Sequence, residues 1–277
     1  MTFSLRLAAD GTIERPALSP PPADTHKYAR GHAVVVSGPV LRTSAARLSA
    51  TAALAVGAGL VTIIGDRPAL VEHASHLTAI MLRERDATFS AIDDRVRALL
   101  IGPGAGVGEN LTNDVATLLA RRLPIVLDAD ALTAFSANPK TLFAMLFDQA
   151  VLTPHDGEFA RLFPDIALTD RPRAASAAAK RAGAVVLLKG PQTLIAAPDG
   201  RFAINRHAAP WLATAGSGDV LAGLICGLLA QGKDAFEGAA TACWLHGDIG
   251  VKGGPGLTAD SMVQYLPLVL RDILQDA

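Results

Sequence analysis

The segment Ala215–Gly223 (AGSGDVLAG) carries residues suited to phosphate chemistry. Here the chain passes from a glycine-containing loop into an apolar helix predicted over residues 218–230. Glycines let backbone N–H groups approach a ligand closely, and the first turn of a helix leaves such groups unpaired, so a phosphate would bind well. Asp219 would repel that phosphate unless its carboxylate takes a proton from an attacking hydroxyl. Aspartate is also a favoured helix cap, so the spacing alone leaves both roles open.

Four other segments with chemical potential each follow a predicted strand. They are the glycine-rich loop Ile101–Gly108, the acids Asp128 and Asp130, the segment Leu152–Glu158 with His155, and the segment Leu188–Thr193 with Lys189. Lys189 could place its charge against nucleotide phosphates, the paired acids could reach a metal or a ligand hydroxyl, and Glu158 could hold a phosphate-bound Mg²⁺ through water. Each also has an ordinary alternative as a turn, a helix cap or a surface side chain. Because strand ends gather at one edge of an open α/β sheet, we interpret the segments as one site.

The composition narrows the class of protein. Of 277 residues, 50% are hydrophobic and 18% are charged, and the formal net charge is -1. Without a basic surplus we expect no nucleic-acid partner. No apolar run approaches the roughly 20 residues that cross a bilayer, so we expect no membrane contact and a soluble, cytoplasmic protein. Cys226 and Cys243 lie in apolar helical patterns, which predicts buried hydrophobic roles rather than a disulfide or a metal site.

Most of the chain alternates short apolar runs with helical patterns, which predicts a mainly parallel sheet covered on both faces. Strands are predicted at residues 32–37, 60–64, 78–82, 97–101, 124–127, 150–152 and 184–188, and a hairpin at 194–197 and 202–205. Helices are predicted at residues 44–56, 68–75, 114–122, 139–147, 157–162, 173–182, 218–230, 236–249 and 258–275. The proline-rich stretch Pro16–Asp24 indicates an extended arm over residues 1–24, followed by a single domain over residues 25–277.

Taken in order, these motifs resemble those of the ATP/ADP-dependent NAD(P)H-hydrate dehydratase family, which belongs to the ribokinase-like superfamily. The matching segments are GSGDVLAG at Gly216–Gly223, GPGAG at Gly102–Gly106, DADAL at Asp128–Leu132, LTPHDGE at Leu152–Glu158, KGPQT at Lys189–Thr193 and the pair His246-Gly247. The resemblance covers about Thr25 to the C-terminus and implies a three-layer α/β/α fold with a central, mainly parallel sheet. The epimerase domain often fused ahead of this one is not expected in the residues before His26.

The resemblance implies a repair reaction on hydrated nicotinamide nucleotides. ADP or ATP, with Mg²⁺, would phosphorylate the hydroxyl of the S-form of NAD(P)H hydrate, and loss of phosphate would restore NAD(P)H. The implied roles are a base at Asp219, an anion hole at Gly216, Ser217 and Gly218, nucleotide contacts at Lys189, Gly190, Pro191, Gln192, Thr193 and Gly218, and substrate contacts at Ala45, Gly104, His155 and Asp219. The metal ligands are not identified, with Glu158 acting through water as the candidate. Family analogy also implies a homo-oligomer, with a tetramer as the expected assembly.

The sequence departs from the family pattern at three places. Tyr28 stands where glycine is common, Ser37-Gly38-Pro39 where Gly-Gly-Ser is usual, and Thr133 where asparagine is frequent. The first two lie in the N-terminal third of the chain, so the assignment of Ala45 to the substrate is the one most affected.

Two other functions fit part of the pattern. A ribokinase-like kinase that phosphorylates a vitamin-precursor or sugar hydroxyl would share the glycine turn and Asp219. His155 and the loop Gly102–Gly106 favour the dehydratase over this kinase. A non-enzymatic nucleotide-sensing protein could use the same pocket, but an acid beside phosphate brings no benefit to binding alone.

Overall fold

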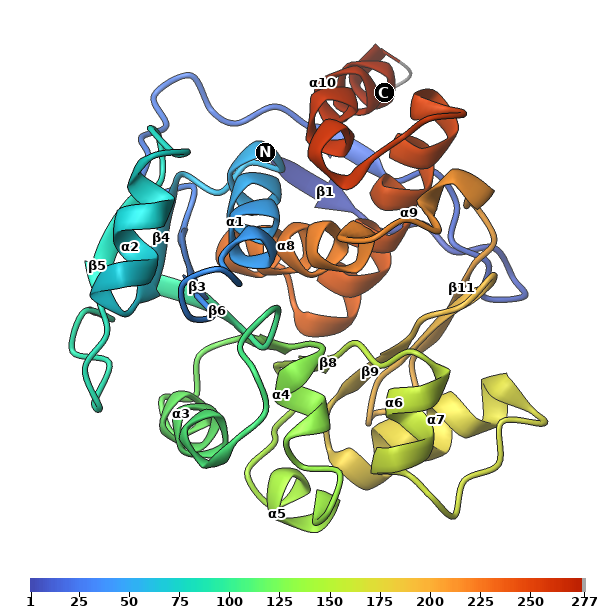
Figure 1. Ribbon diagram of the computed structural model, residues 1–277. Coiled ribbons are helices and arrows are strands. Elements are labelled where there is room, and N and C mark those ends of the chain that lie inside the picture. Colours follow the sequence, from blue (N-terminus) through green and yellow to red (C-terminus); the bar gives the residue numbers. More distant parts are fainter. Residues whose placement is uncertain (276–277) are drawn as a thin grey trace.

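The computed structural model describes residues 1–275, and its centre is a mixed, mainly parallel sheet (Figure 1). Its strands are β3 (His32–Val36), β4 (Leu60–Gly65), β5 (Met81–Glu84), β6 (Val96–Ile101), β7 (Ile125–Leu127), β8 (Ala150–Leu152), β9 (Val185–Leu188), β10 (Thr193–Ala196) and β11 (Phe202–Asn205). Within the described residues the spatial order is β11-β10-β9-β8-β7-β6-β3-β4-β5. Pairing is parallel from β5 to β9 and antiparallel for β9–β10 and β10–β11, so the predicted hairpin is confirmed.

Helices cover both faces of the sheet, which confirms the predicted three-layer α/β/α arrangement (Figure 1). One layer contains α1 (Ser44–Ala55), α8 (Ser217–Ala230), α9 (Ala235–Gly253) and α10 (Ala259–Gln275). The other contains α3 (Glu109–Leu119), α4 (Asp130–Thr133), α5 (Pro139–Phe143), α6 (Asp156–Leu162) and α7 (Arg171–Ala182). The helix α2 (Arg67–Ala74) packs against β4 and β5, and a short 3-10 turn at Pro210–Leu212 precedes α8. Because β3, β7, β8 and β9 are covered on both faces, each is buried at every residue, as continuous apolar runs predict.

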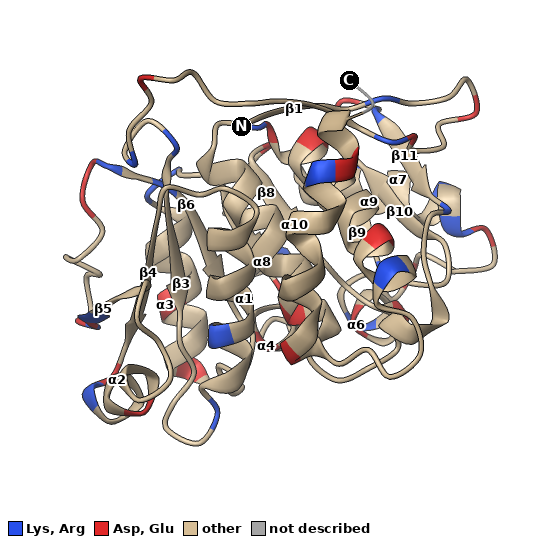
Figure 2. Cartoon of the chain, turned by 90° about the horizontal axis from the view of Figure 1, so that it is seen from above, with Lys and Arg blue, Asp and Glu red and all other residues tan. Residues whose placement is uncertain are grey.

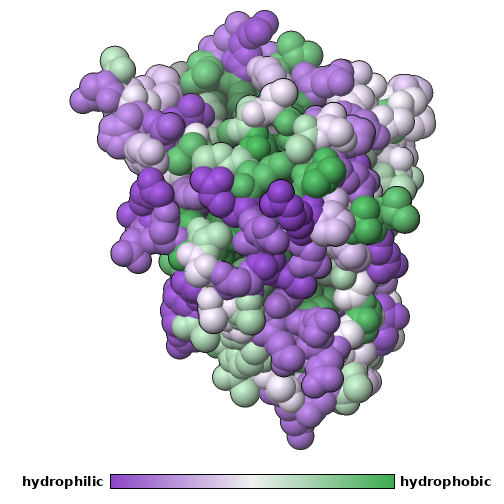
Figure 3. Space-filling view, turned by 60° about the vertical axis from the view of Figure 1, so that its left-hand side comes forward, coloured by the Kyte–Doolittle hydropathy of each residue, from purple (hydrophilic) through white to green (hydrophobic). Residues whose placement is uncertain are grey.

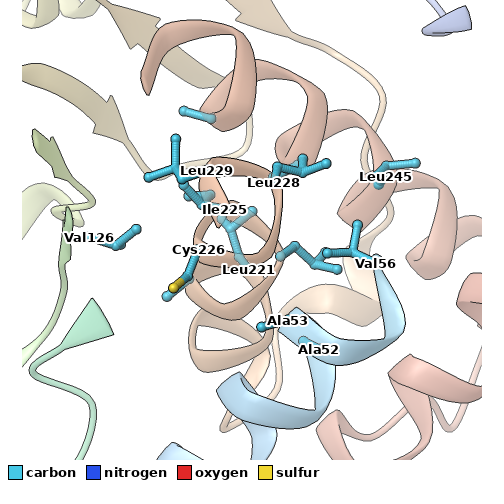
Figure 4. Close-up of a cluster of buried hydrophobic side chains, with 14 of the residues drawn as sticks. Ala52, Ala53, Val56, Val126, Leu221, Ile225, Cys226, Leu228, Leu229 and Leu245 are labelled. Carbon is cyan, nitrogen blue, oxygen red and sulfur yellow. The ribbon is translucent and has the colours of Figure 1, made fainter. Parts of the chain in front are cut away.

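The helix α8 is held against α1 by close backbone contact. A Cβ added at Gly223 would lie 2.2 Å from the Ser49 carbonyl oxygen, and one at Gly227 would lie 2.6 Å from that of Ala53. Figure 4 shows apolar side chains of α1, α8, α9 and β7 that pack around this pair of helices. The Ala- and Gly-rich sequences of both helices are therefore a packing requirement. This packing fixes the position of the first turn of α8.

Both cysteines are buried, as predicted, Cys226 in α8 and Cys243 in α9. Burial raises the pKa of both thiols, that of Cys243 to about 12. Neither is a reactive thiolate at neutral pH.

Some element boundaries differ from the sequence predictions. The helix predicted at 114–122 begins at Glu109 and ends at Leu119, and Leu111 in its first turn lies on the same buried face as Val115 and Leu118. The strand predicted at 78–82 lies at Met81–Glu84, and the helix predicted at 139–147 ends at Phe143. The helix predicted to end at residue 249 continues to Gly253.

The N-terminal arm at residues 1–24 lies against the domain. Its strands β1 (Thr2–Ser4) and β2 (Ala17–Ser19) pair antiparallel, and β2 packs on α10. Phe3 and Leu18 are buried within the same apolar cluster as α8. The backbone N–H of Ile13 also donates to the Ile204 carbonyl, at 2.9 Å. The domain boundary at residue 25 stays a prediction.

The surface is mixed in charge and polarity. Figure 2 shows that acidic and basic residues are distributed along the chain, and Figure 3 shows hydrophobic residues among hydrophilic ones on one face. Among residues 1–275, no helix has the length and apolarity needed to cross a membrane.

Candidate active site

The carboxyl ends of β7, β8 and β9 bring three side chains into direct contact. Asp128 follows β7 and is 2% exposed. The Lys189 Nζ, just after β9, donates to Asp128 Oδ1 at 2.8 Å, and Thr153 Oγ1, after β8, donates to the same oxygen at 2.7 Å. Because these strands are parallel neighbours, their ends lie side by side. The predicted convergence of the Asp128 and Lys189 loops is confirmed.

Lys189 is a cation surrounded by acids. Burial tends to lower the pKa of Lys189, but the carboxylates of Asp128, Glu158 and Asp219 together raise it above its ordinary value. The Glu158 carboxylate is 4.0 Å from Nζ. A Cβ added at Gly218 would lie 3.7 Å from Nζ, so the ammonium group faces the first turn of α8. A permanent positive charge therefore lies beside the predicted anion hole.

The turn before α8 requires glycine. Gly216 has φ +85°, and a Cβ there would lie 2.7 Å from Leu48 Cδ1 and 2.8 Å from Ala259 Cβ. The Ser217 N–H donates to the Thr214 carbonyl at 3.3 Å. Gly218 and Asp219 occupy first-turn positions, where a helix offers no carbonyl to the N–H groups. These two N–H groups are suited to binding an anion.

Asp219 has the environment of a base. Burial, followed by the neighbouring charges of Asp128 and Asp130, raises the pKa of Asp219 to about 6, although Lys189 acts in the opposite direction. The Ser49 hydroxyl donates to the Asp219 carbonyl at 2.9 Å and ties this turn to α1. The N-cap position of α8 is occupied by Gly216, so Asp219 lies within the first turn rather than at the cap position. A carboxylate with a pKa near 6 is largely ionised at neutral pH and accepts protons readily.

Asp130 joins two of the predicted loops. Its Oδ2 accepts the Gly106 N–H at 2.7 Å, which ties the loop Gly102–Gly106 to the end of β7. Ala129, between the two acids, has φ +51°, an unusual value for a residue with a side chain. The strained turn lets the two carboxylates serve different partners. Sequence spacing placed them together but did not reveal this division.

Ala45 and Gly104, both predicted to contact the substrate, lie next to each other. Gly104 has φ +67°, and a Cβ there would lie 3.4 Å from Ala45 Cβ and 2.7 Å from the Arg42 carbonyl oxygen. A cavity of about 370 Å³ adjoins this loop, between the ends of β3, β4 and β6 and the start of α3. It is lined by, among others, Ser37, Pro39, Asp66, Arg85, Gly106 and Asp114. The cavity does not include Asp219, so it adjoins the predicted reaction centre without containing it.

His155 and Glu158 cap α6 as a reciprocal pair. His155 Nδ1 accepts the N–H groups of Gly157 at 2.9 Å and Glu158 at 3.3 Å, and Glu158 Oε2 accepts the His155 N–H at 2.9 Å. The structure thus gives both residues a helix-capping role, which was the alternative considered for Glu158. The His155 side chain is 56% exposed, and its substrate contact stays a prediction.

The donor set near Lys189 fits Mg²⁺ only in a water-rich form. Within residues 1–275, no group of three or more His, Cys, Asp or Glu side chains could hold a metal by itself. Mg²⁺ commonly keeps several waters and uses one or two carboxylates together with substrate phosphates. The Glu158 carboxylate, 7% exposed and facing the Lys189 loop, suits such an indirect contact.

Several contacts in the site have no signal in the sequence. The hydrogen bonds of Thr153 to Asp128, of Ser49 to the Asp219 carbonyl and of Gly106 to Asp130 are tertiary contacts between ordinary residue types. His246, in α9, matched the family pattern without a role, and its Nε2 lies 3.0 Å from Ser217 Oγ.

The fold and the site together define a ribokinase-like protein, because the glycine turn, Asp219 and Lys189 lie at the carboxyl edge of the sheet. A ribokinase-like superfamily protein of known structure superposes well on this chain. A family model described as NAD(P)H-hydrate dehydratase matches residues 33–275. The chain belongs to the NAD(P)H-hydrate dehydratase family.

Individual relatives agree with this assignment. The chain is 37% identical over 231 residues to the ADP-dependent (S)-NAD(P)H-hydrate dehydratase of Neisseria meningitidis, covering 81% of this chain and 77% of that protein. It is 38% identical over 275 residues to the bifunctional NAD(P)H-hydrate repair enzyme Nnr of Moorella thermoacetica, covering 92% of this chain but 52% of that protein. The chain therefore spans about half the length of the bifunctional relatives. The crystal structure of the ADP/ATP-dependent NAD(P)H-hydrate dehydratase of Bacillus subtilis, co-crystallised with ATP/Mg²⁺, gives a TM-score of 0.80 at 27% identity and covers 93% of this chain and 95% of its own.

Proposed function

We propose that this protein repairs hydrated nicotinamide nucleotides by ADP- or ATP-dependent dehydration of the S-form of NAD(P)H hydrate. The observation that carries the proposal is the position of Asp219. Its carboxyl group, whose pKa burial raises to about 6, belongs to the first turn of α8, which the Lys189 ammonium group approaches at Gly218. This is the arrangement that transfer of a phosphoryl group to a hydroxyl requires, because a base and an anion site must lie side by side.

In the proposed reaction, Asp219 takes the proton from the ring hydroxyl of the hydrate. The hydroxyl oxygen attacks the terminal phosphoryl group of the nucleotide, a P–O bond forms, and ADP or AMP leaves. The phosphorylated ring then loses phosphate with the C–O bond electrons, and a proton leaves the adjacent carbon to restore the double bond. Phosphate is a far better leaving group than hydroxide, which accounts for the need for a nucleotide.

We assign the binding roles along the sheet edge. The first turn of α8, with the N–H groups of Gly218 and Asp219, stabilises charge on the transferred group. Lys189 and the following residues Gly190 to Thr193 hold the adenine nucleotide. Ala45, Gly104 and His155 hold the hydrated dinucleotide. Mg²⁺, when bound, neutralises phosphate charge, and Glu158 contacts it through water.

Absorbance of the reduced nicotinamide ring tests the proposal directly. Purified protein is mixed with NADH hydrate or NADPH hydrate, Mg²⁺ and either ADP or ATP, with Asp219→Asn as the matched variant. A nucleotide-dependent rise in absorbance that the variant abolishes supports the proposal. Consumption of nucleotide without that rise identifies a small-molecule kinase instead, and nucleotide binding without consumption identifies a sensing protein. The preferred nucleotide and hydrate emerge from the same experiment.

The cellular location and the assembly need separate measurements. A cytoplasmic location and a tetrameric homo-oligomer stay predictions. Light scattering of the purified chain measures the second.

A further inference from the structure

His246 of α9 is buried against the first turn of α8 and directs one ring nitrogen at Ser217. The distance from His246 Nε2 is 3.0 Å to Ser217 Oγ and 3.1 Å to the Ser217 carbonyl oxygen. His246 is 9% exposed and Ser217 is 5% exposed. Polar atoms as buried as these are normally hydrogen-bonded, so the direction of each bond matters.

The two contacts define which ring nitrogen of His246 carries the hydrogen. A carbonyl oxygen only accepts hydrogen bonds, so the 3.1 Å contact requires a hydrogen on Nε2. A bare Nε2 would instead bring its lone pair against those of the carbonyl. Burial lowers the pKa of His246 to about 4. The charge of Lys189 also lowers this pKa, whereas the hydrogen bond to the Ser217 carbonyl raises it. The ring is therefore neutral at pH 7, with its single N–H directed at Ser217.

This hydrogen-bond direction leaves the Ser217 hydroxyl with an unused hydrogen. The hydroxyl oxygen accepts from Nε2–H, and its own hydrogen is free to donate to another group. The Ser217 backbone N–H already donates to the Thr214 carbonyl at 3.3 Å, so it contributes little to an anion hole. The hydroxyl is thus the donor that Ser217 can offer to a ligand.

Lys189 lies close to the turn that carries this donor. His246 contacts Ser217 from α9, and the Lys189 loop approaches the same first turn of α8. The ammonium group also faces Gly218, the residue next to Ser217. An anion held by Lys189 and this turn would lie within reach of the serine.

We propose that Ser217 is a catalytic residue whose hydroxyl donates a hydrogen bond to the transferred phosphoryl group, and that His246 is the positioning residue that orients it. The proposal rests on the proposed function, because it requires a phosphoryl group between Lys189 and α8. Removing one donor of this kind from a site of developing charge lowers kcat by about 10²-fold or more, and a partly solvated site reduces that to about 10-fold to 100-fold. His246 makes no contact with the substrate and acts only through Ser217.

Four single variants and one double variant test the two roles. Ser217→Ala should lower kcat about 10-fold to 100-fold with little change in KM for the hydrate, and Ser217→Thr should retain most of kcat. His246→Leu should lower kcat, and His246→Gln, whose amide N–H reaches a similar position, should restore much of it. If His246 acts through Ser217, the double variant Ser217→Ala/His246→Leu should be no slower than Ser217→Ala. Additive losses would overturn the positioning role.

A binding measurement separates this proposal from the proposed function. Calorimetry with Mg²⁺, ADP and aluminium fluoride mimics the phosphoryl group in transfer and needs no hydrate. Ser217→Ala should weaken this binding by a factor similar to the loss in kcat, while binding of AMP stays unchanged. Wild-type protein that binds the mimic but does not restore NADH would refute the proposed function. The calorimetric comparison with Ser217→Ala would then still test whether the serine hydroxyl contacts the phosphoryl group. Equal binding and, where turnover occurs, equal kcat in wild type and Ser217→Ala would overturn the inference, even if the thermal midpoint falls.

Discussion

The ammonium group of Lys189 and the carboxylate of Asp128 form an ion pair with 2.8 Å between Nζ and Oδ1. Asp128 also accepts the Thr153 hydroxyl, and Asp130 accepts the Gly106 N–H, so the two carboxylates have different hydrogen-bond partners. Asp219 carries the raised pKa because it is buried beside these two charges. The three neighbouring acids thus have different surroundings, and the proposed proton acceptor is the one whose pKa burial raises.

Replacing Lys189 tests its two roles. Lys189→Met should raise KM for the nucleotide at least 10-fold and raise the pKa of Asp219, because Lys189 lowers it. It should also cost about 2 kcal/mol of unfolding free energy, below the 3–5 kcal/mol typical of a broken buried pair because the lysine is partly exposed. Nucleotide titration and urea unfolding measure these effects, with Lys189→Arg as the control that keeps the charge. An unchanged nucleotide KM would remove Lys189 from the nucleotide site.

Activity should depend on pH through Asp219. The base must be ionised, so kcat/KM for the hydrate should rise with pH and level off above about 6, the pKa of Asp219. Rates between pH 4.5 and 8.5 at saturating nucleotide give the profile. The residual activity of Asp219→Asn should lack this rise. A wild-type profile that is flat through pH 6 would argue against Asp219 as the base.

Asp219→Asn should be more stable than wild type at pH 8. The pKa of this carboxyl group is higher in the folded chain, about 6, than its ordinary 3.8, so the folded state binds the proton more tightly. Wild-type stability therefore falls as pH rises from about 4 to 6, and the variant escapes this loss. With a discount for partial exposure, we expect a gain of about 1–2 kcal/mol at pH 8. Urea unfolding should show the two proteins equal near pH 3.5, and an equal stability at pH 8 would contradict the prediction.

Gly104 should be far less tolerant of substitution than Gly108 in the same loop. Gly104 has φ +67°, and a Cβ would lie 2.7 Å from the Arg42 carbonyl oxygen, so Gly104→Ala must displace the loop beside Ala45. We expect KM for the hydrate to rise about 10-fold or more while KM for the nucleotide is kept. Gly108→Ala is the control, because a Cβ there meets open space. Equal kinetics for the two variants would exclude the loop from the substrate site.

Ser37, where the family pattern has glycine, should hold the loop Ser37-Gly38-Pro39 in place through His73. His73 is fully buried, its Nε2 lies 2.8 Å from Ser37 Oγ, and Ser37 Oγ donates to the Gly38 carbonyl at 2.7 Å. A Cβ at Gly38 would lie 2.0 Å from the Gly104 carbonyl oxygen, so this loop abuts the glycine loop. Ser37→Ala should cost about 1–2 kcal/mol and raise KM for the hydrate severalfold, with KM for the nucleotide unchanged. Thermal unfolding and paired titrations measure this, and a rise in both KM values would point to general loss of structure.

Local patterns were sufficient to predict most of the architecture. Short apolar runs that alternate with helical patterns predict a mainly parallel sheet between helices. A continuous apolar run indicates a strand buried on both faces, and helical periodicity indicates a helix buried on one face. Helix boundaries are predicted less well: α3 begins at Glu109, five residues before the predicted start, although Leu111 lies on the same buried face as Val115. The close approach of α1 and α8 at Gly223 likewise appears only in three dimensions.

The sequence by itself determined the residue types at the candidate site, since a helix start preceded by glycines and followed by Asp219 is a local feature, and the strand-end loops follow from chain order. Only the tertiary structure decided how those residues divide the work. In the tertiary structure Lys189 forms an ion pair with Asp128, Asp130 accepts the Gly106 N–H, and His155 caps α6. His246 of α9 contacts Ser217. These assignments depend on hydrogen bonds and burial between segments far apart in the chain, and the pKa of a carboxyl group depends on that surrounding rather than on its neighbours in sequence.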